Sequence, residues 1–313
     1  MVGSGARWKT LVAFALIYFV WGSTFLAIRI GVHEVPPLLF AAMRFFTAGV
    51  ILWVWTLFQG QPWPSGREWL SVSVLAVLIF VVDYGCLFWA EQRVPSGIAA
   101  VMLATIPVFT AIAEITLLRT QQLTVRLAFA LLLGIAGVAV LVSHSFNLGG
   151  APIDSVGAAA LLVGSMSWSL ASVLTRRLPQ PSSKLLSAGM QMAVGGVFLV
   201  ATSAALGEFH RFHIESVSRA AWLSLWYMIV AGSLLGFTAY VWLIHRESPT
   251  KVGTYAYVNP LVAVAIGYFW GGEPLTGRTV MGTICVLISV AIITTTRAKT
   301  AVQAPDAIET VRR

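Results

Sequence analysis

The chain has 313 residues, of which 58% are hydrophobic and only 10% are charged. Soluble domains carry about 25% charged residues, so this composition argues against a water-soluble enzyme and is typical of a protein that crosses a membrane several times. The net charge of +8 would suggest nucleic-acid binding in a soluble protein, but here the basic residues are spread through short loops, where membrane topology explains them. No nucleic-acid partner is expected.

We therefore predict an all-α polytopic membrane protein with ten transmembrane helices. A helix needs about 20 apolar residues to cross a bilayer, and each predicted span is an apolar run that ends at proline, glycine or a charged residue. The first run is too long for the apolar part of a signal peptide, so it is interpreted as a retained span. In chain order, the predicted spans are 10–30, 36–58, 68–90, 96–118, 124–144, 154–175, 184–206, 219–244, 250–271 and 277–296.

The distribution of basic residues predicts the orientation of the chain. With a cytoplasmic N-terminus, the segments on the cytoplasmic side hold 14 of the 20 lysines and arginines, and the opposite loops hold five. Cytoplasmic loops carry an excess of these residues in membrane proteins. Both termini are therefore predicted to be cytoplasmic, with residues 298–313 as a disordered tail.

The two halves of the chain share an internal repeat. A shift of 147 residues places Trp21 on Trp168, and a shift of 153 residues places Pro107 on Pro260. Single matches between apolar segments arise by chance, but matches of tryptophan and proline in the same order along the chain indicate a true repeat.

The repeat predicts two five-helix domains, residues 1–148 and 149–297. An odd number of spans makes the second copy enter from the opposite face, so the repeats are expected to be inverted about a pseudo-two-fold axis in the membrane plane. Secondary transporters recurrently have this architecture, with a binding site at the middle of the membrane.

Matched features of the two halves give the first candidate binding residues. Trp21 and Ser23 lie in the middle of the first span, and Trp168 lies at the matching place in the sixth. These residues line a substrate site in one interpretation and pack helices in the other. Pro107 and Pro260 are expected to break helices 4 and 9 at matched positions, which points to a binding site.

Three charged residues fall inside spans: Arg44, Asp83 and Glu114. Charges in a membrane usually face the bundle interior and have partners. One interpretation is proton coupling at Asp83 or Glu114 with a cationic partner, and the other is a structural pair between Arg44 and a carboxylate. Glu91 and Arg93 end the third span and are interpreted as loop charges or as a gate pair.

No cofactor and no metal site are predicted. His210 and His213 have metal-ligand spacing, but no third ligand lies near them in the sequence. The chain has no phosphate-binding glycine loop of the G-x-x-x-x-G-K-[ST] type. Gly-x-x-x-Gly motifs permit close helix contact within the fold, so the chain is expected to be a monomer or a weak dimer.

Several motifs together resemble EamA-type members of the drug/metabolite transporter superfamily, and the likeness covers nearly the whole chain. The motifs are VWGST at 20–24, MRF at 43–45, AEQ at 90–92, VPSGIAA at 94–100, YVNP at 257–260 and GEPLT at 272–276. The resemblance implies an inverted five-plus-five transporter of the bacterial inner membrane with a central cavity and an exporting role. It also implies that Trp21, Trp168, Arg44, Tyr257, Asn259 and Pro260 lie at the cavity. Asp83 belongs to none of these motifs and departs from the pattern.

These observations predict a secondary exporter of amino acids or related small amphipathic metabolites. The candidate aromatic wall consists of Trp21, Tyr84, Trp168, Phe237, Tyr240, Tyr255 and Tyr257, and Ser23, Arg44 and Asn259 are candidate polar contacts. The expected partners are a small-molecule substrate, the lipid bilayer and, with coupling, protons. The alternatives are an exporter of cationic drugs or quaternary amines, whose charge aromatic faces attract, and a non-transporting membrane enzyme or sensor.

Overall fold

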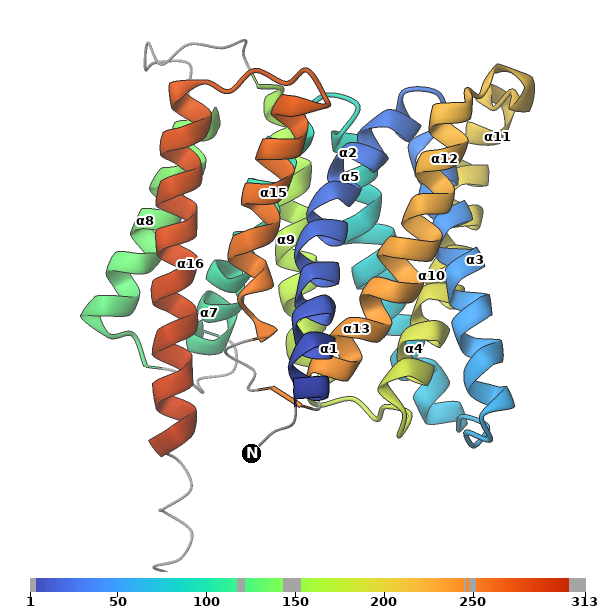
Figure 1. Cartoon of the computed structure of the whole chain (residues 1–313), viewed down its shortest axis with the longest axis horizontal. Coiled ribbons are helices and arrows are strands. Elements are labelled where there is room, and N and C mark those ends of the chain that lie inside the picture. The colour runs from blue at the N-terminus through green and yellow to red at the C-terminus, as the bar shows by residue number, and fades with distance from the viewer. Residues whose placement is uncertain (1–3, 117–121, 143–152, 245, 248–251, 304–313) are drawn as a thin grey trace, which may run out of the picture.

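The computed structural model describes residues 4–116, 122–142, 153–244, 246–247 and 252–303. All regular secondary structure in these ranges is helical, and nine helical stretches are long and apolar enough to cross a membrane (Figure 1). A tenth apolar helix, Tyr255–Phe269, is shorter. The predicted all-α, ten-helix architecture is therefore confirmed.

The predicted spans and the observed helices agree to within a few residues. The first half contains α1 (Ser4–Ala15), η1 (Leu16–Val20), α2 (Trp21–Val32), α3 (Pro37–Phe58), α4 (Gly66–Ala76), η2 (Val77–Tyr84), α5 (Gly85–Ala90), α6 (Ser96–Leu103), α7 (Ile106–Thr116) and α8 (Val125–Val142). The second half contains α9 (Ser155–Thr175), α10 (Lys184–Ala205), α11 (Glu208–Arg211), η3 (Ile214–Ser216), α12 (Arg219–Tyr227), η4 (Met228–Leu235), α13 (Gly236–Ile244), α15 (Tyr255–Phe269) and α16 (Gly277–Gln303).

The helix ends follow from local sequence. Side chains at the N-terminal caps accept hydrogen bonds from backbone N–H groups that the first turn leaves free. Ser65 and Glu68 form a reciprocal capping box at α4, and similar caps come from Asp154, Ser183 and Ser218. Helix α16 continues to Gln303, into the segment expected to be a tail, and residues 304–313 of that tail lie outside the described residues.

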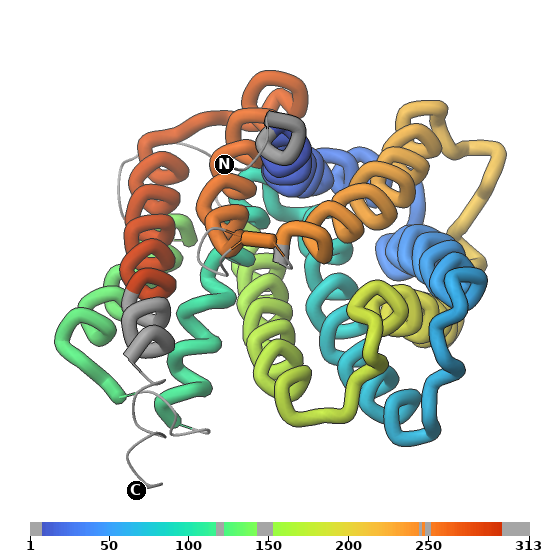
Figure 2. Tube along the Cα trace, turned by 60° about the horizontal axis from the view of Figure 1, so that its bottom comes forward, coloured from blue at the N-terminus to red at the C-terminus, as the bar shows by residue number. Residues whose placement is uncertain are grey.

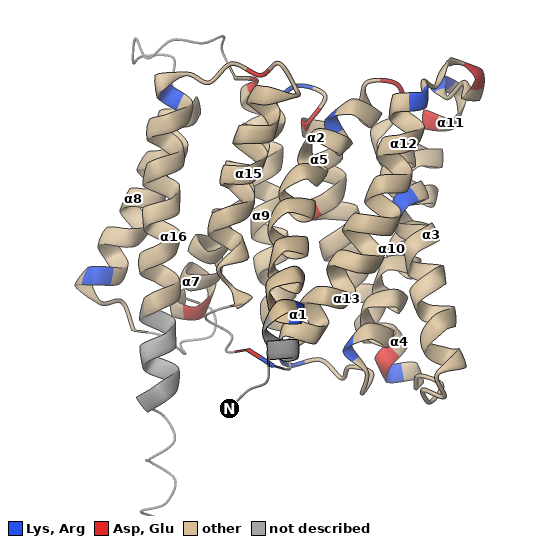
Figure 3. Ribbon diagram, viewed as in Figure 1, with Lys and Arg blue, Asp and Glu red and all other residues tan. Residues whose placement is uncertain are grey.

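The helices run between two sides of the bundle. Helix α1 begins and α16 ends on the same side (Figure 1), called here the N-terminal side, and the opposite side is called the far side. Charged residues gather at these two sides, and the middle of the bundle is almost free of them (Figure 3). In the tilted view, α9 lies between the pair formed by α8 and α16 and the group that contains α3 and α10 (Figure 2).

The pairing of α3 with α10 has a two-fold character. A Cβ atom added to Gly49 would collide with the backbone of Ala193, and one added to Gly196 would lie 2.6 Å from Cα of Phe46. The 147-residue shift converts one contact into the other, because it carries Gly49 to Gly196 and Phe46 to Ala193. Contacts that exchange in this way are those of two copies related by a two-fold axis.

The pair formed by α8 and α16 repeats this relation. A Cβ atom on Gly134 would lie 2.7 Å from Oγ of Ser289, and one on Gly137 would lie 2.9 Å from Cγ2 of Val286. A shift of 152 residues exchanges these two contacts. Both helix pairs therefore support the expected inverted arrangement of the two halves.

Each half also contains a π-helical segment at the same place in its third span. Segment η2 begins at Val77 and η4 begins at Met228, and each has eight residues. A π-helical turn disturbs the regular hydrogen bonding of the helix, and such turns are frequent at functional sites. A further π-helical segment, η1, lies in the first span.

Candidate substrate cavity

A cavity of about 270 Å³ lies among α2, α3, η2, α6, α7, α9, η4, α13 and α15. Its volume is near the lower end for small-molecule sites, which begin at about 300 Å³. The predicted residues that line it are Trp21, Arg44, Asp83, Tyr84, Pro107, Trp168, Phe237, Tyr240, Tyr255, Asn259 and Pro260. Residues that the sequence placed in seven different spans therefore meet around one space.

Three predicted residues lie outside this lining. The Ser23 hydroxyl donates to the carbonyl of Val20 and bonds the Tyr227 hydroxyl. The Tyr257 hydroxyl donates to the carbonyl of Val290 in α16, 3.5 Å away. Glu114 lies 3.4 Å from the guanidinium of Arg176 on the N-terminal side of the bundle.

Trp21 connects the first span to the π-helical segment of the opposite half. Its indole Nε1 donates a hydrogen bond of 2.9 Å to the carbonyl of Gly232 in η4. Its ring lies 5.5 Å from that of Tyr240 and 5.4 Å from that of Tyr255, at tilted and edge-on angles. These are favourable aromatic geometries, so one face of the cavity is a fixed cluster of rings.

Asn259 makes a second connection to a π-helical segment. In the amide orientation that satisfies its donors, the side-chain nitrogen lies 3.0 Å from the carbonyl oxygen of Ile17 in η1. A Cβ atom on Gly22 would lie 2.7 Å from Val262, so only glycine at this position lets α15 approach the first span. The Trp-Gly pair in the first span therefore has two roles, a ring at the cavity and a close helix contact.

The opposite wall is built from rings of the first half together with Trp168 of α9. The Tyr84 ring lies 4.5 Å from that of Phe45, stacks on Phe80 at 5.7 Å and meets Trp168 edge-on at 6.1 Å. Trp21 and Trp168, which the repeat aligns, thus lie in different aromatic clusters of the same cavity.

Arg44 brings a buried positive charge to the cavity, with only 4% of its surface exposed. Its Nε donates to Oγ of Ser233 at 3.2 Å, and its guanidinium lies 4.8 Å from the centre of the Phe45 ring. The salt bridges among the described residues include none at Arg44. The structural Arg44–carboxylate pair considered from the sequence is not formed in the described part of the chain.

Asp83 brings a carboxyl group to the same cavity and is 2% exposed. Its Oδ1 atom has no hydrogen-bond partner in the described residues. It lies against α9, where a Cβ atom on Gly164 would be 2.9 Å from that oxygen. The cavity therefore contains a buried guanidinium and a buried carboxyl group, and no salt bridge joins them in the described part of the chain.

The two prolines differ in their effect on the helices. The fourth span is interrupted between Leu103 and Ile106, directly before Pro107, whereas α15 runs without a break through Pro260. The expectation of matched helix breaks is therefore wrong for the ninth span. Each proline removes the N–H group that would bond the carbonyl four residues earlier, and those residues, Leu103 and Ala256, both line the cavity.

Two buried glutamates that the sequence did not single out as candidate site residues hold helix N-termini on the far side. Glu273 accepts hydrogen bonds from the backbone N–H groups of Ser96 and Gly97, at 2.6 and 3.0 Å. Glu208 accepts them from Leu38 and Leu39 at the start of α3. Carboxylates favour helix N-termini because of the helix dipole.

The gate pair of Glu91 and Arg93, one of the two alternatives considered from the sequence, is not formed among the described residues. Arg93 lies over the Trp89 ring at 4.5 Å and 3.9 Å from Asp154. Glu91 is completely buried, and neither of its carboxyl oxygens has a hydrogen-bond partner among the described residues.

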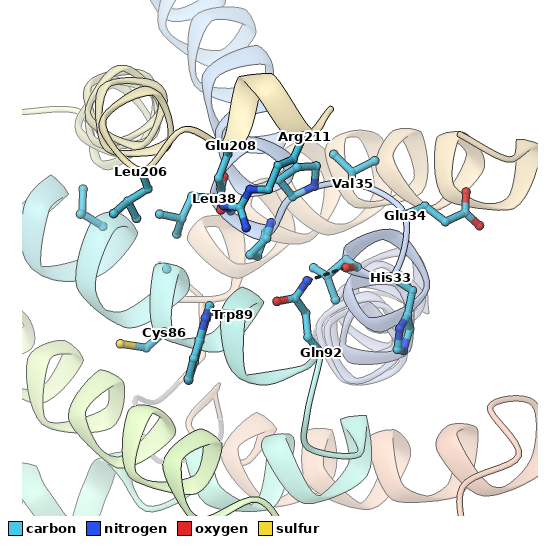
Figure 4. A pocket seen from close by; sticks show the side chains of 15 residues that line it. His33, Glu34, Val35, Leu38, Cys86, Trp89, Gln92, Leu206, Glu208 and Arg211 are labelled. Carbon is cyan, nitrogen blue, oxygen red and sulfur yellow. Dashed lines mark hydrogen bonds between the residues drawn. The ribbon is translucent and has the colours of Figure 1, made fainter. Parts of the chain in front are cut away.

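A second cavity of about 560 Å³ opens between the first half and α11 (Figure 4). Trp89, Cys86 and Gln92 border it, and the Gln92 amide donates to the carbonyl of Val32. Segment η2 and helix α5 form a wall of both cavities, because alternate faces of this span line each of them. No motif in the sequence indicated this second cavity.

A bundle of apolar helices around a cavity with aromatic walls and buried charges defines a membrane transport protein rather than a soluble enzyme. Comparison with known proteins gives the same class. The chain matches the EamA-like transporter family over residues 8–143 and 155–295. It belongs to that family.

The chain is similar to the uncharacterized inner membrane transporter YedA of Escherichia coli K12, with 36% identity over 280 residues that cover 89% of this chain and 88% of YedA. It is 27% identical over 276 residues to the protein PecM of Dickeya dadantii, covering 88% of each chain. A solved crystal structure superposes with a TM-score of 0.58 at 21% identity, covering 94% of this chain and 99% of the other. That similarity supports the fold.

Proposed function

We propose that the protein exports amino acids or related small zwitterions from the cytoplasm by alternating access. The two halves, residues 1–148 and 149–297, rock against each other around the central cavity. The protein lies in the inner membrane with both termini in the cytoplasm.

The observation that carries this proposal is the presence of Arg44 and Asp83 in the same apolar cavity without an ion pair between them. A buried charge without a counter-charge is costly. A substrate that carries both a carboxylate and an ammonium group supplies the missing partner to each residue. The aromatic walls around Trp21 and Tyr84 suit the apolar side chain of the same molecule.

Three probes test the substrate class. They share a benzene ring on a short carbon chain and differ in whether they carry a carboxylate, an ammonium group or both. Phenylalanine is a zwitterion, phenethylamine lacks the carboxylate, and 3-phenylpropionate lacks the ammonium group. We expect saturable exchange of labelled phenylalanine in proteoliposomes that contain the unlabelled compound, and little exchange of the other two. Exchange of the two singly charged probes as fast as that of phenylalanine would contradict the proposal.

Variants of the two charged residues assign the ends of the substrate. Arg44→Gln is expected to raise the KM for phenylalanine about tenfold to hundredfold, the size of a lost charged hydrogen bond, and to improve the relative exchange of phenethylamine. Asp83→Asn is expected to do the reverse, in favour of 3-phenylpropionate. Ser23→Ala is the control, because Ser23 lies outside the cavity.

The alternative function is export of cationic drugs or quaternary amines, which the rings and Asp83 favour. Arg44 disfavours it, since a second cation would enter a cavity that already holds a buried guanidinium. Saturable exchange of phenethylamine alone, abolished in Asp83→Asn, would establish the alternative.

A further inference from the structure

Glu91 is a buried carboxyl group that no part of the proposed substrate site uses. It directly follows α5 on the far side, and its surface is 0% exposed. Both of its oxygens lack a hydrogen-bond partner among the described residues. Other buried carboxylates of the far side are bonded: Glu208, for example, accepts a hydrogen bond from the Ser203 hydroxyl in addition to two backbone N–H groups.

Arg29, the positive charge that acts most strongly on Glu91, is held by another acid. Arg29 lies 3.5 Å from Glu273 and donates to the carbonyl of Val94 at 2.8 Å. Glu273 in turn holds the backbone N–H groups at the start of α6. We call this arrangement, formed by Arg29, Glu273 and the N–H groups of Ser96 and Gly97, the latch. It ties the first span, the loop before α16 and the fourth span together on the far side.

In the described part of the chain, the charged groups of α3 and at the start of α9 already have partners. Arg44 of α3 bonds Ser233 and Met228, and helix α9 has no titratable side chain between Ser155 and Thr175. The N-cap of α9, Asp154, pairs with Arg93.

The nearby titratable groups on the same span as Glu91 are Asp83, Tyr84 and Cys86. Burial raises the pKa of the Glu91 carboxyl well above its usual range, and the Glu273 carboxylate raises it further. Arg29 and, more weakly, Arg44 oppose this shift.

We infer that Glu91 is a proton-binding residue of the transport cycle, protonated while the latch is closed. This inference rests on the proposed transport function. A neutral Glu91 leaves Arg29 entirely to Glu273, so the latch holds. Release of the proton through the central cavity to the N-terminal side leaves a carboxylate that competes for Arg29 and repels Glu273. The cap on α6 then weakens, and the far side opens.

The position of Glu91 links this proton to the substrate. Leu87, one helical turn before Glu91, lines the central cavity. Ionisation of Glu91 and release of substrate to the far side therefore involve the same helix. The resulting cycle exchanges substrate for a proton, which binds Glu91 when the far side is open and leaves through the central cavity to the N-terminal side after the latch has closed.

A cysteine beneath the latch reports its opening without any substrate. Ser96 is 0% exposed and its hydroxyl has no hydrogen-bond partner in the described residues, so Ser96→Cys preserves the local bonds. In a background with Cys86→Ser and Cys285→Ser, a membrane-impermeant maleimide labels this cysteine only when the latch opens. Between about pH 6 and pH 8, thiol reactivity itself rises about tenfold per unit, so the comparison needs a reference.

Glu91→Gln supplies that reference, because glutamine is neutral at every pH and has nearly the same size and shape as glutamate. We expect the labelling rate of the parent to rise more steeply with pH than that of Glu91→Gln, by about tenfold or more over this range. Glu208→Gln is the matched control, because Glu208 is a buried carboxylate that has hydrogen-bond partners. Its labelling rate is expected to rise with pH as steeply as that of the parent. Identical slopes in the parent and in Glu91→Gln would overturn the inference.

A flux measurement separates failure of this inference from failure of the proposed function. With phenylalanine in proteoliposomes, a gradient of about one pH unit drives about tenfold accumulation when one proton exchanges for one substrate. Glu91→Gln is expected to lose this accumulation, and its persistence would refute the role of Glu91. If the wild type moves none of the three aromatic probes, the proposed function fails while the labelling experiment still decides the role of Glu91.

Discussion

Single side chains of the cavity also hold its two halves together. The indole of Trp21 belongs to the first half and bonds the Gly232 carbonyl of the second, and a Cβ atom on Gly236 would lie 2.5 Å from the indole nitrogen. The ring thus fits a slot that Gly236, the first residue of α13, leaves open. When one half moves against the other, this hydrogen bond either breaks or keeps Trp21 and Gly232 moving together.

Trp21→Phe removes the indole N–H group and keeps an aromatic ring. The Gly232 carbonyl loses its partner, and leaving a buried polar group unsatisfied costs about 1–3 kcal/mol. We expect a lower thermal unfolding temperature in detergent and a changed KM for phenylalanine. Trp270→Phe is the control, since Trp270 is 77% exposed. Equal unfolding temperatures of the two variants would show that the bond contributes little.

The residues that the sequence placed correctly and those it misplaced differ in their helical phase. Arg44 and Asp83 are ionisable residues in apolar runs. Exposing such a side chain to lipid is costly, so it faces the interior of the helix bundle. The sequence placed Tyr257 at the cavity together with Tyr255, and Ser23 together with Trp21. Residues two apart on an α-helix point in nearly opposite directions, so only one member of each pair can face the cavity. The spacing of 3.6 residues per turn contains enough information to exclude these two assignments.

At the scale of helices, glycines set the distance between partners. Gly49 and Gly196 lie on opposite helices, and each touches the backbone of the other helix. The contact is therefore a close crossing of two helices, of the kind that small residues permit in membranes.

Gly49→Ala and Gly196→Ala are each expected to destabilise the protein by about 1–3 kcal/mol, because an added methyl group overpacks the crossing. The double variant is expected to cost less than the sum, since the first methyl group already separates the helices and relieves the second. Unfolding in detergent measures all three. Gly66→Ala, which has open space around its Cβ position, is the control, and additive effects would argue against a shared crossing.

Glu208 shows how a side chain distant in sequence completes a helix end. Glu208→Ala leaves the N–H groups of Leu38 and Leu39 without their carboxylate, at an expected cost of about 1–3 kcal/mol. Because α3 packs along α10, the loss is expected to show as faster proteolysis of the far-side loops as well as a lower unfolding temperature. Glu215→Ala, an exposed residue in the same segment, is the control.

Several features of the elements were beyond sequence reasoning. The caps formed by Glu208 and Glu273 join residues about 170 positions apart, and hydrophobic periodicity contains no information on such pairs. The π-helical segments also escape prediction, since one inserted residue in a long apolar run leaves the hydropathy unchanged. Pro260 was expected to break its helix, but α15 tolerates it, as membrane helices often do.

At the scale of the whole molecule, the number of spans follows from the number of long apolar runs in the sequence. Each apolar run has to be a helix, because lipid offers no partner for backbone polar groups. The inside–outside orientation depends instead on the loop charges. The loops on the N-terminal side of the bundle include Arg176, Arg177 and Lys184, and this placement supports the proposed cytoplasmic termini.

Cysteine labelling in intact cells tests this orientation. In a background without the native cysteines, we expect a membrane-impermeant maleimide to react with Glu215→Cys on the far side and not with Gln59→Cys on the N-terminal side. Both positions are exposed, so permeabilised cells should label both equally. Labelling of Gln59→Cys alone in intact cells would reverse the orientation.

The two buried charges of the cavity come from the same half. The repeat aligns Arg44 with Gln191 and Asp83 with Gly236, which carry no charge. A dimer of two identical five-helix subunits would present two arginines and two aspartates, arranged so that every ligand fits equally well in two opposite orientations. Fusion into one chain removes this degeneracy. The covalently joined halves hold an asymmetric ligand in a single orientation, so that the chirality of the molecule, and not only its charge, can be recognised.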